Sequence, residues 1–164
     1  MKKIGLISDT HSYLHPKIFE YFIECDEIWH AGDVGNASII DELAKFKTIR
    51  AVYGNIDGQE IRKVCPKNQR FICEEVDVWI THIGGYPDRY SSDVREDIKK
   101  NPPNLFISGH SHILKVMYDK KLNLLHMNPG AAGKYGIHKL ITMLRFSIDG
   151  KEIKNLEVIE LPKN

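Results

Sequence analysis

Short apolar runs alternate with amphipathic segments through the first half of the chain. Three runs, Lys3 to Ser8, Glu27 to His30 and Thr48 to Val52, have the length and β-branched content typical of strands. Between them, Pro16 to Cys25 and Ala37 to Phe46 place apolar side chains at helical spacing. This βαβαβ order predicts parallel strands joined by right-handed crossovers. The side chains expected to face the sheet are Ile18, Phe19, Phe22 and Ile23 in the first helix, and Ile39, Ile40, Leu43 and Phe46 in the second.

The second half of the chain is richer in strands. Arg70 to Cys73 and Val76 to Thr81 predict a hairpin, and a polar helix is expected from about Ser91 to Lys100. A sheet must bury its apolar face, so we expect an α/β architecture of two packed sheets with helices outside them. Further strands, antiparallel at the tail, are expected at Leu105 to Ser108, Leu114 to Tyr118, Leu122 to His126, Lys139 to Ser147 and Lys154 to Leu161.

Composition fits one ordinary globular domain spanning residues 1–164, with 42% hydrophobic and 27% charged residues. The formal net charge of +1 is spread over mixed signs, which gives no signal for nucleic acid or for an anionic membrane surface. Three cysteines form no Cys-x-x-Cys pair, which favours reduced thiols. The apolar run after Met1-Lys2-Lys3 is too short for a signal peptide, and no stretch approaches a membrane span. We therefore expect a cytoplasmic protein.

Metal-binding side chains occur where the apolar runs end. In α/β sheets, the loops that leave the carboxyl ends of the strands converge on one edge, so side chains distant in sequence become neighbours there. These positions predict a hydrolytic site with two metals. The candidate ligands are Asp9, His11, Asp33, Asn55, His82, His110 and His112.

Each candidate taken alone also has a structural interpretation. Aspartates after strands commonly cap helices, asparagine beside glycine is a usual turn residue, and single histidines are often hydrogen-bonded in cores. His110 and His112 are harder to explain in this way, although extended backbone would point them to opposite faces. A loop at Gly109 must therefore turn them towards two metals. Oxygen and nitrogen ligands without thiolate suit manganese, iron, zinc, cobalt or nickel better than calcium.

The ordered set resembles a known family. Its motifs are Asp9-x-His11, Gly32-Asp33, Gly54-Asn55-x-Asp57, Thr81-His82 and Gly109-His110-Ser111-His112, followed by the Asn128-Pro129-Gly130 turn. Together they resemble the calcineurin-like metallophosphoesterases, and specifically their small, single-domain, YfcE-type phosphodiesterase branch. The resemblance implies a four-layer αββα sandwich in which helices flank two mixed sheets. It also implies a dinuclear centre at one edge, with manganese the favoured metal.

Carried over by position, the family pattern divides the ligands between two metals. Asp9, His11 and His112 would hold one ion, and Asp33 would bridge to the other. A water bound between two cations becomes hydroxide near neutral pH, and this hydroxide is the expected nucleophile on a small phosphate ester. The resemblance assigns Asn55, His82 and His110 to the second ion.

One position departs from the larger phosphatases of the superfamily. They carry a histidine that assists the leaving group directly after the asparagine ligand, whereas this chain has Ile56 after Asn55. Isoleucine cannot donate a proton, so the site lacks that general acid. We therefore expect phosphodiesters and activated esters to be preferred over alkyl monoesters.

Several neighbouring residues have both a functional and a structural interpretation. Asp57 orients a ligand or is a turn residue, and His30 lies near the metals or has a structural role. Gly84, Gly85 and Arg89 could line the substrate pocket, because arginine suits phosphate and glycine allows close approach, or they form a plain flexible loop.

Two other functions share this pattern. One is a non-catalytic interaction module, because the fold is also used by the retromer's phosphoesterase-like subunit, in which ligand positions have decayed. The other is a nuclease, which the near-neutral charge disfavours. Self-association is a further expectation, through Trp79 or Tyr90, which we expect to be exposed.

Overall fold

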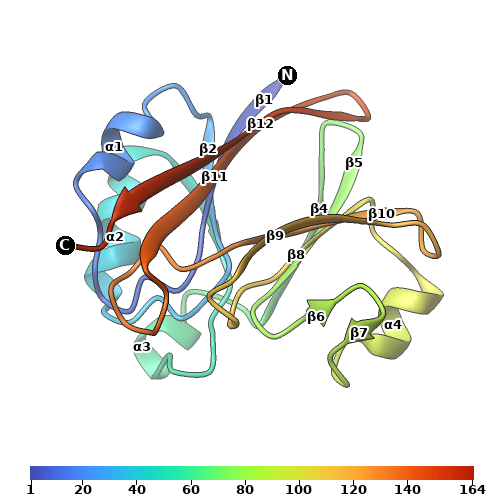
Figure 1. Ribbon diagram of the computed structural model, residues 1–164, viewed down its shortest axis with the longest axis horizontal. Helices are drawn as coiled ribbons and strands as arrows, with labels where there is room; N and C mark the ends of the chain where they lie inside the picture. The colour runs from blue at the N-terminus through green and yellow to red at the C-terminus, as the bar shows by residue number, and fades with distance from the viewer.

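A computed structural model describes residues 1–164, in which two five-stranded sheets carry most of the chain (Figure 1). The strands of the first sheet run in the order β12-β11-β1-β2-β3. Its first three strands in sequence are parallel, as the βαβαβ pattern predicts, and β11 is antiparallel to both β1 and β12. The bounds are β1 (Lys2–Ile7), β2 (Glu27–His30), β3 (Thr48–Ala51), β11 (Leu140–Asp149) and β12 (Glu152–Pro162).

The second sheet has the order β4-β5-β8-β10-β9. Its three central strands are parallel, and the edge strands β4 and β9 pair antiparallel with their neighbours. Both sheets are therefore mixed. The bounds are β4 (Asn68–Cys73), β5 (Val76–Thr81), β8 (Leu105–Ile107), β9 (Leu114–Asp119) and β10 (Leu124–Pro129), and a separate small hairpin joins β6 (Gly85–Tyr86) to β7 (Arg89–Tyr90).

The elements form four layers, which confirms the predicted αββα sandwich (Figure 1). The helices α1 (Lys17–Tyr21) and α2 (Ala37–Phe46) lie on one side, and α4 (Arg95–Lys100) lies on the other. Between the sheets, Trp29 packs edge-on against Phe71 and Phe146, and it is fully buried. A second apolar cluster joins the first sheet to α1 and α2, and a third joins the second sheet to α4.

The helices differ in detail from the sequence prediction. α2 matches it, because the Asn36 side chain accepts a hydrogen bond from the Ser38 N–H and so caps the first turn. The first predicted helix is too long, because α1 ends at Tyr21. The Asp26 N–H then donates to the Lys3 carbonyl of β1, and Ile23 is exposed rather than packed on the sheet. α4 also starts later than predicted, because a turn with a Val94 N–H to Ser91 carbonyl bond precedes it. No helix is long and apolar enough to cross a membrane.

Other differences concern turns and aromatic side chains. The short helix α3 (Gln59–Arg62) was not predicted, and β10 begins at Leu124 because the Asp119 carboxylate holds the preceding turn. The expectation that Trp79 and Tyr90 are exposed is wrong. Both are buried against Phe106 under α4, so neither offers a surface for self-association.

Candidate metal centre

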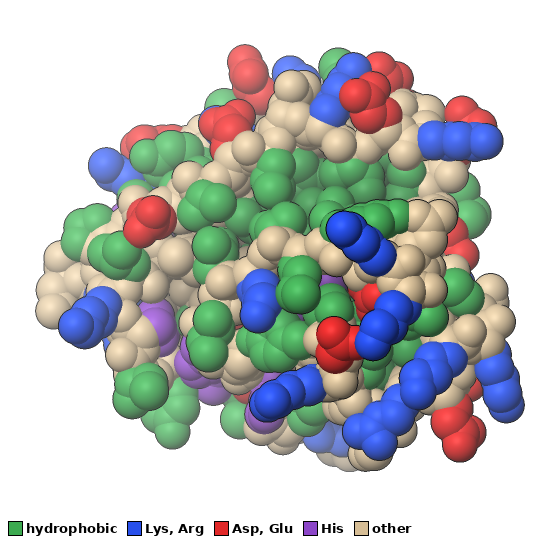
Figure 2. Space-filling model, turned by 45° about the vertical axis from the view of Figure 1, so that its right-hand side comes forward, with side chains coloured by type: hydrophobic (Ala, Val, Ile, Leu, Met, Phe, Trp, Pro, Cys, Tyr) green, Lys and Arg blue, Asp and Glu red, His purple; other side chains and the backbone are tan.

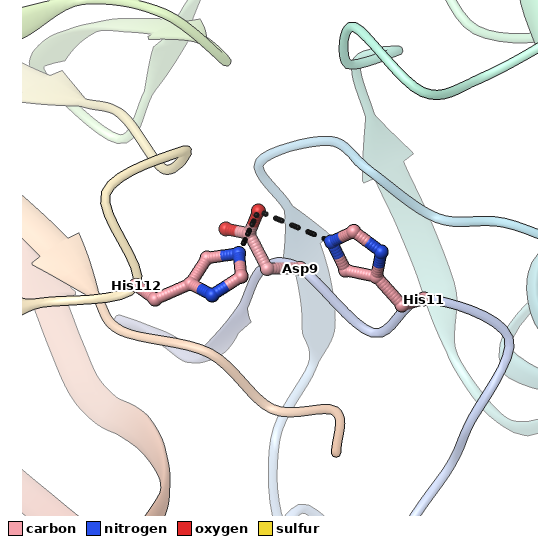
Figure 3. Close-up of side chains that lie close together, drawn as sticks. All are labelled: Asp9, His11 and His112. Atoms are coloured by element: carbon pink, nitrogen blue, oxygen red, sulfur yellow. Dashed lines mark ion pairs between the residues drawn. The ribbon is translucent and has the colours of Figure 1, made fainter. Parts of the chain in front are cut away.

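A first group of ligands lies where β1 ends (Figure 3). Asp9 and His11 come from the loop after β1, and His112 comes from the loop between β8 and β9. One oxygen of Asp9, Oδ1, lies 3.2 Å from Nε2 of His112 and 3.9 Å from Nε2 of His11. One ligand atom from each residue lies within 4.8 Å of the others, a spacing compatible with a single cation.

A second group lies beside the first. Asp33, His82 and His110, from the loops after β2, β5 and β8, also place one ligand atom each within 4.8 Å of the others. Asn55 joins this group, because its Oδ1 lies 3.0 Å from Nδ1 of His110. Histidine side chains are visible on the face drawn in Figure 2, beside hydrophobic side chains. All seven predicted ligands therefore meet at one edge of the sheets.

Asp33 lies between the two groups. Its Oδ2 is 3.4 Å from Nε2 of His11 in the first group and 3.3 Å from Nε2 of His82 in the second. Its other oxygen, Oδ1, accepts a hydrogen bond of 3.0 Å from the Ile56 N–H. The carboxylate thus reaches both groups, as a bridging ligand would.

Three of the donor atoms facing this centre have no hydrogen-bond partner. Oδ1 of Asp9, Nε2 of His11 and Nε2 of His82 are all buried and unpaired. A buried polar atom without a partner costs about 1–3 kcal/mol, so such atoms are rarely left unpaired. Two imidazole nitrogens and a carboxylate oxygen converging on one space have the donor chemistry of a divalent transition metal. The residues present therefore fit a metal.

Hydrogen bonds fix the orientation of the ligands. Nδ1 of His82 lies 2.7 Å from the Ala31 carbonyl, which can only accept, so Nδ1 carries the proton and Nε2 has a free lone pair. Oδ2 of Asp9 accepts hydrogen bonds from the Ser8 hydroxyl at 2.6 Å and from the His110 N–H at 3.1 Å. These contacts leave one atom of each ligand directed at the centre.

The electrostatics of Asp33 and His82 are coupled. Burial acts to raise the pKa of Asp33, but the neighbouring His82 outweighs it and the pKa is lowered. Burial acts to lower the pKa of His82, but Asp33 and Asp9 outweigh it and the pKa is raised. The carboxylate is therefore ionised at neutral pH and is available to a cation.

His30 lies beneath the centre rather than in it. It is fully buried, and burial lowers its pKa to about 4. Its Nδ1 accepts a hydrogen bond from the Gly32 N–H, so the proton is on Nε2, which lies 2.9 Å from the Thr10 hydroxyl. That hydroxyl donates in turn to the Val34 carbonyl at 2.8 Å. The neutral imidazole thus connects the loops after β1 and β2.

Asp57 connects two other loops. Its buried carboxylate accepts hydrogen bonds from the N–H groups of Val34 at 3.1 Å, Gly35 at 2.9 Å and Gly54 at 2.7 Å. The first two follow Asp33, and the third precedes Asn55. The Asp57 carboxylate therefore ties the loop that carries Asp33 to the loop that carries Asn55.

The two glycine candidates have a structural explanation. A Cβ at Gly84 would lie 2.6 Å from the Phe106 ring, and Gly85 has a φ of +75° at the start of the β6–β7 hairpin. Arg89 pairs with Tyr86 in this hairpin, and its side chain is exposed. These contacts explain both glycines without a substrate, and the substrate role of Arg89 stays a prediction.

The loop between β10 and β11 covers part of the first group. The Tyr135 ring stacks on His11 with a centroid separation of 4.8 Å, and His138 lies edge-on to His112 at 5.4 Å. Gly136 passes so close that a Cβ there would lie 2.5 Å from Nδ1 of His112. No motif marks this loop; its only signal is the glycine and aromatic content after the Asn128-Pro129-Gly130 turn.

A family model for the calcineurin-like phosphoesterase superfamily domain matches residues 1–151. The chain therefore belongs to this superfamily of metal-dependent phosphoesterases, as its motifs predict. It is similar to a probable metallophosphoesterase of Methanocaldococcus jannaschii, with 31% identity over 134 residues, 78% of this chain and 67% of the relative. A phosphodiesterase of the same organism is 29% identical over 149 residues, 81% of this chain and 86% of that protein.

Solved structures agree with the fold. Vps29 of Chaetomium thermophilum superposes with a TM-score of 0.76 at 13% identity over 100% of both chains. An archaeal phosphodiesterase superposes with a TM-score of 0.74 at 24% identity, covering 97% of this chain and 99% of that one. At these identities the likeness shows the shared metallophosphoesterase fold alone.

Proposed function

We propose that the protein hydrolyses a small phosphodiester at a dinuclear metal centre. The observation that carries the proposal is the position of Asp33, whose Oδ2 lies within 3.4 Å of a histidine nitrogen from each ligand group. One carboxylate that reaches two groups can hold two cations close enough to act together, at about 4 Å. Manganese suits the oxygen and nitrogen donors, and nickel, zinc, iron or cobalt would also fit.

The chain's own residues would bind and orient both cations. Asp9, His11 and His112 would hold one ion, Asn55, His82 and His110 would hold the other, and Asp33 would bridge them. When bound, two divalent cations polarise the phosphoryl group and make hydroxide available near neutral pH as the nucleophile. No side-chain nucleophile is then needed.

Ile56 supports the choice of a diester. Ile56 is 47% exposed, and its contact at the centre is the backbone N–H that donates to Asp33. An apolar side chain cannot protonate a leaving alkoxide, so esters with good leaving groups should react best. We therefore expect activity on aryl phosphodiesters to exceed activity on alkyl monoesters.

A metal-screened assay tests this proposal. Metal-free protein is loaded in turn with Mn²⁺, Ni²⁺, Zn²⁺ or Mg²⁺ and assayed on bis(p-nitrophenyl) phosphate beside an alkyl monoester, glycerol 2-phosphate. We expect metal-dependent turnover with the diester preferred. Comparable rates on both esters would refute the diester preference, and the absence of turnover with every metal would favour a non-catalytic interaction module instead.

Asp33→Ala tests the dinuclear arrangement. Loss of the bridge leaves two cations facing each other without the shared anion, so we expect the bound metal to fall below two per chain and activity to be abolished. Elemental analysis after dialysis gives the stoichiometry. Asp41→Ala, on the exposed side of α2, is the matched control and should keep both metal and activity. Retained activity in Asp33→Ala would refute the dinuclear model.

A further inference from the structure

A small hollow lies directly beside the second ligand group. It has a volume of about 130 Å³, and Asn55 and His82 form part of its wall. The Tyr53 N–H donates to the Pro66 carbonyl at 3.0 Å, which holds the loop after β3 against the start of β4. The hollow is therefore walled by anchored segments and opens next to the centre. Its lining residues are Tyr53, Gly54, Asn55, Lys67, Thr81, His82, Ile83 and Asp93.

Lys67 is the only lysine or arginine in this wall. Its Nζ lies 3.5 Å from a carboxylate oxygen of Asp93, and the two side chains are 57% and 60% exposed. Ion pairs this exposed contribute about 0–1 kcal/mol, so the ammonium can leave Asp93 at little cost. Lysine has three donors at the end of a flexible four-carbon stem, which lets it follow a reacting oxygen.

The position of the hollow suits an ester group of the substrate. A phosphoryl group bound to the metals uses its non-ester oxygens there, so its ester oxygens must point away from them. Because Asn55 and His82 also line the hollow, an ester group that points past these two residues would enter it. Ile56, the side chain that follows Asn55, has no proton to offer, whereas Lys67 carries a positive charge and hydrogen-bond donors.

We propose that the hollow receives the leaving group and that Lys67 stabilises the leaving oxygen. As the hydroxide oxygen bonds to phosphorus, the bond from phosphorus to the leaving oxygen breaks, and that oxygen keeps the electron pair. The Lys67 ammonium donates a hydrogen bond to this oxygen and offsets its negative charge, and a proton from water completes the alcohol. The proposal rests on the phosphodiesterase activity inferred above.

A series of methyl aryl phosphates with phenols of increasing pKa tests the proposal. Lys67→Met should lower kcat by roughly 100-fold for the least acidic phenol, by analogy with the loss of other donors to a developing negative charge. The loss should be only several-fold for 4-nitrophenol, whose anion needs little help. Lys67→Arg should restore part of the rate. Lys45→Met, with the same charge change on α2, should match the wild type across the series.

The pattern of losses decides the outcome. A drop of the same factor for every phenol, or a change confined to KM, would overturn the leaving-group role and leave Lys67 as a binding residue only. Asp93→Asn frees the ammonium and removes a negative charge, so its kcat should equal or exceed that of the wild type for the least acidic phenol. A fall in that variant to the Lys67→Met level would also overturn the proposal.

A second measurement does not depend on turnover. Lysines are dimethylated with ¹³C, which keeps their charge, and the Lys67 signal is assigned by its loss in Lys67→Arg. Inorganic phosphate added to the metal-loaded protein should shift this signal and leave that of Lys45 unchanged. An unchanged Lys67 signal would overturn the proposal. If no protein, including Lys45→Met, turns over any ester, the phosphodiesterase proposal itself fails, and that result is distinct from failure at Lys67.

Discussion

Removing the carboxylate of Asp57 should loosen the metal centre without touching a ligand. The side chain is buried, and its two oxygens accept three backbone hydrogen bonds, from Val34, Gly35 and Gly54. Asp57→Ala leaves these N–H groups unpaired. Because they flank Asp33 and Asn55, both ligand loops should lose their fixed positions.

The three hydrogen bonds determine the size of the stability loss. A hydrogen bond to a charged group contributes about 1.5–3 kcal/mol, and three such bonds set the upper range. The loss in Asp57→Ala should be smaller, roughly 3–5 kcal/mol, because the carboxylate no longer has to be desolvated and because water can enter the space. Against a typical stability of about 5–15 kcal/mol this is a large fraction. Asp57→Asn keeps one acceptor oxygen and should lose roughly half as much.

Urea unfolding in the presence of a chelator measures this loss. The chelator removes the contribution of metal binding, so that the difference in the free energy of unfolding between variant and wild type reports the loop contacts alone. Asp41→Ala removes an exposed carboxylate from α2 and should change stability by less than about 0.5 kcal/mol. Metal titration should show weaker binding in Asp57→Ala. A stability equal to that of Asp41→Ala, with unchanged metal affinity, would show that the three bonds do not hold the loops.

Two further predictions concern His126 and Gly136. His126 is fully buried, and burial lowers its pKa from 6.5 to about 4, so the unfolded chain takes up this proton first as pH falls. The free energy of unfolding should therefore fall by about 3 kcal/mol as pH drops from 6.5 to about 4, because neutral His126 favours the folded state fully only above pH 6.5. His126→Phe should remove this part of the pH dependence in unfolding curves. Gly136→Ala should weaken metal binding at least tenfold in a titration, because its Cβ would lie 2.5 Å from the His112 ring and its φ is +128°. Gly58→Ala, where a Cβ meets nothing within 4 Å, is the control and should bind metal normally.

The strands were the predictable part of this fold. Runs such as Leu105 to Ile107 are apolar and buried along their whole length, so hydrophobic content alone locates them. Helix ends were less predictable, because turns rather than periodicity set them. Ile23 continues the apolar spacing of α1, yet it lies beyond the helix and is exposed because the chain turns back to β1. Trp79 and Tyr90 were misjudged because no local pattern shows that α4 packs over them.

The candidate ligands could be selected from the sequence because chemistry restricts which side chains bind metals, whereas the groups that hydrogen-bond to them have no such signature. The Ala31 carbonyl that orients His82 could belong to any residue, since a backbone atom leaves no trace in sequence. Asp57 is visible only as an acid near a glycine. These contacts depend on loops meeting across the sheet edge, which periodicity does not describe.

The backbone shows that the centre is held in place by its own loops. Five candidate ligands adopt positive φ values, a conformation that costs a residue other than glycine about 1–3 kcal/mol and persists only where its surroundings impose it. Here the surroundings are hydrogen bonds between loops: Asp9 N–H to the Gly32 carbonyl, His11 N–H to the Asp33 carbonyl and Gly109 N–H to the His82 carbonyl. Because these bonds join backbone to backbone, stripping the metal should leave the fold intact and lower its stability only by the binding free energy of the ions. The five residues are Asp9, His11, Asp33, His110 and His112, with φ between +44° and +73°.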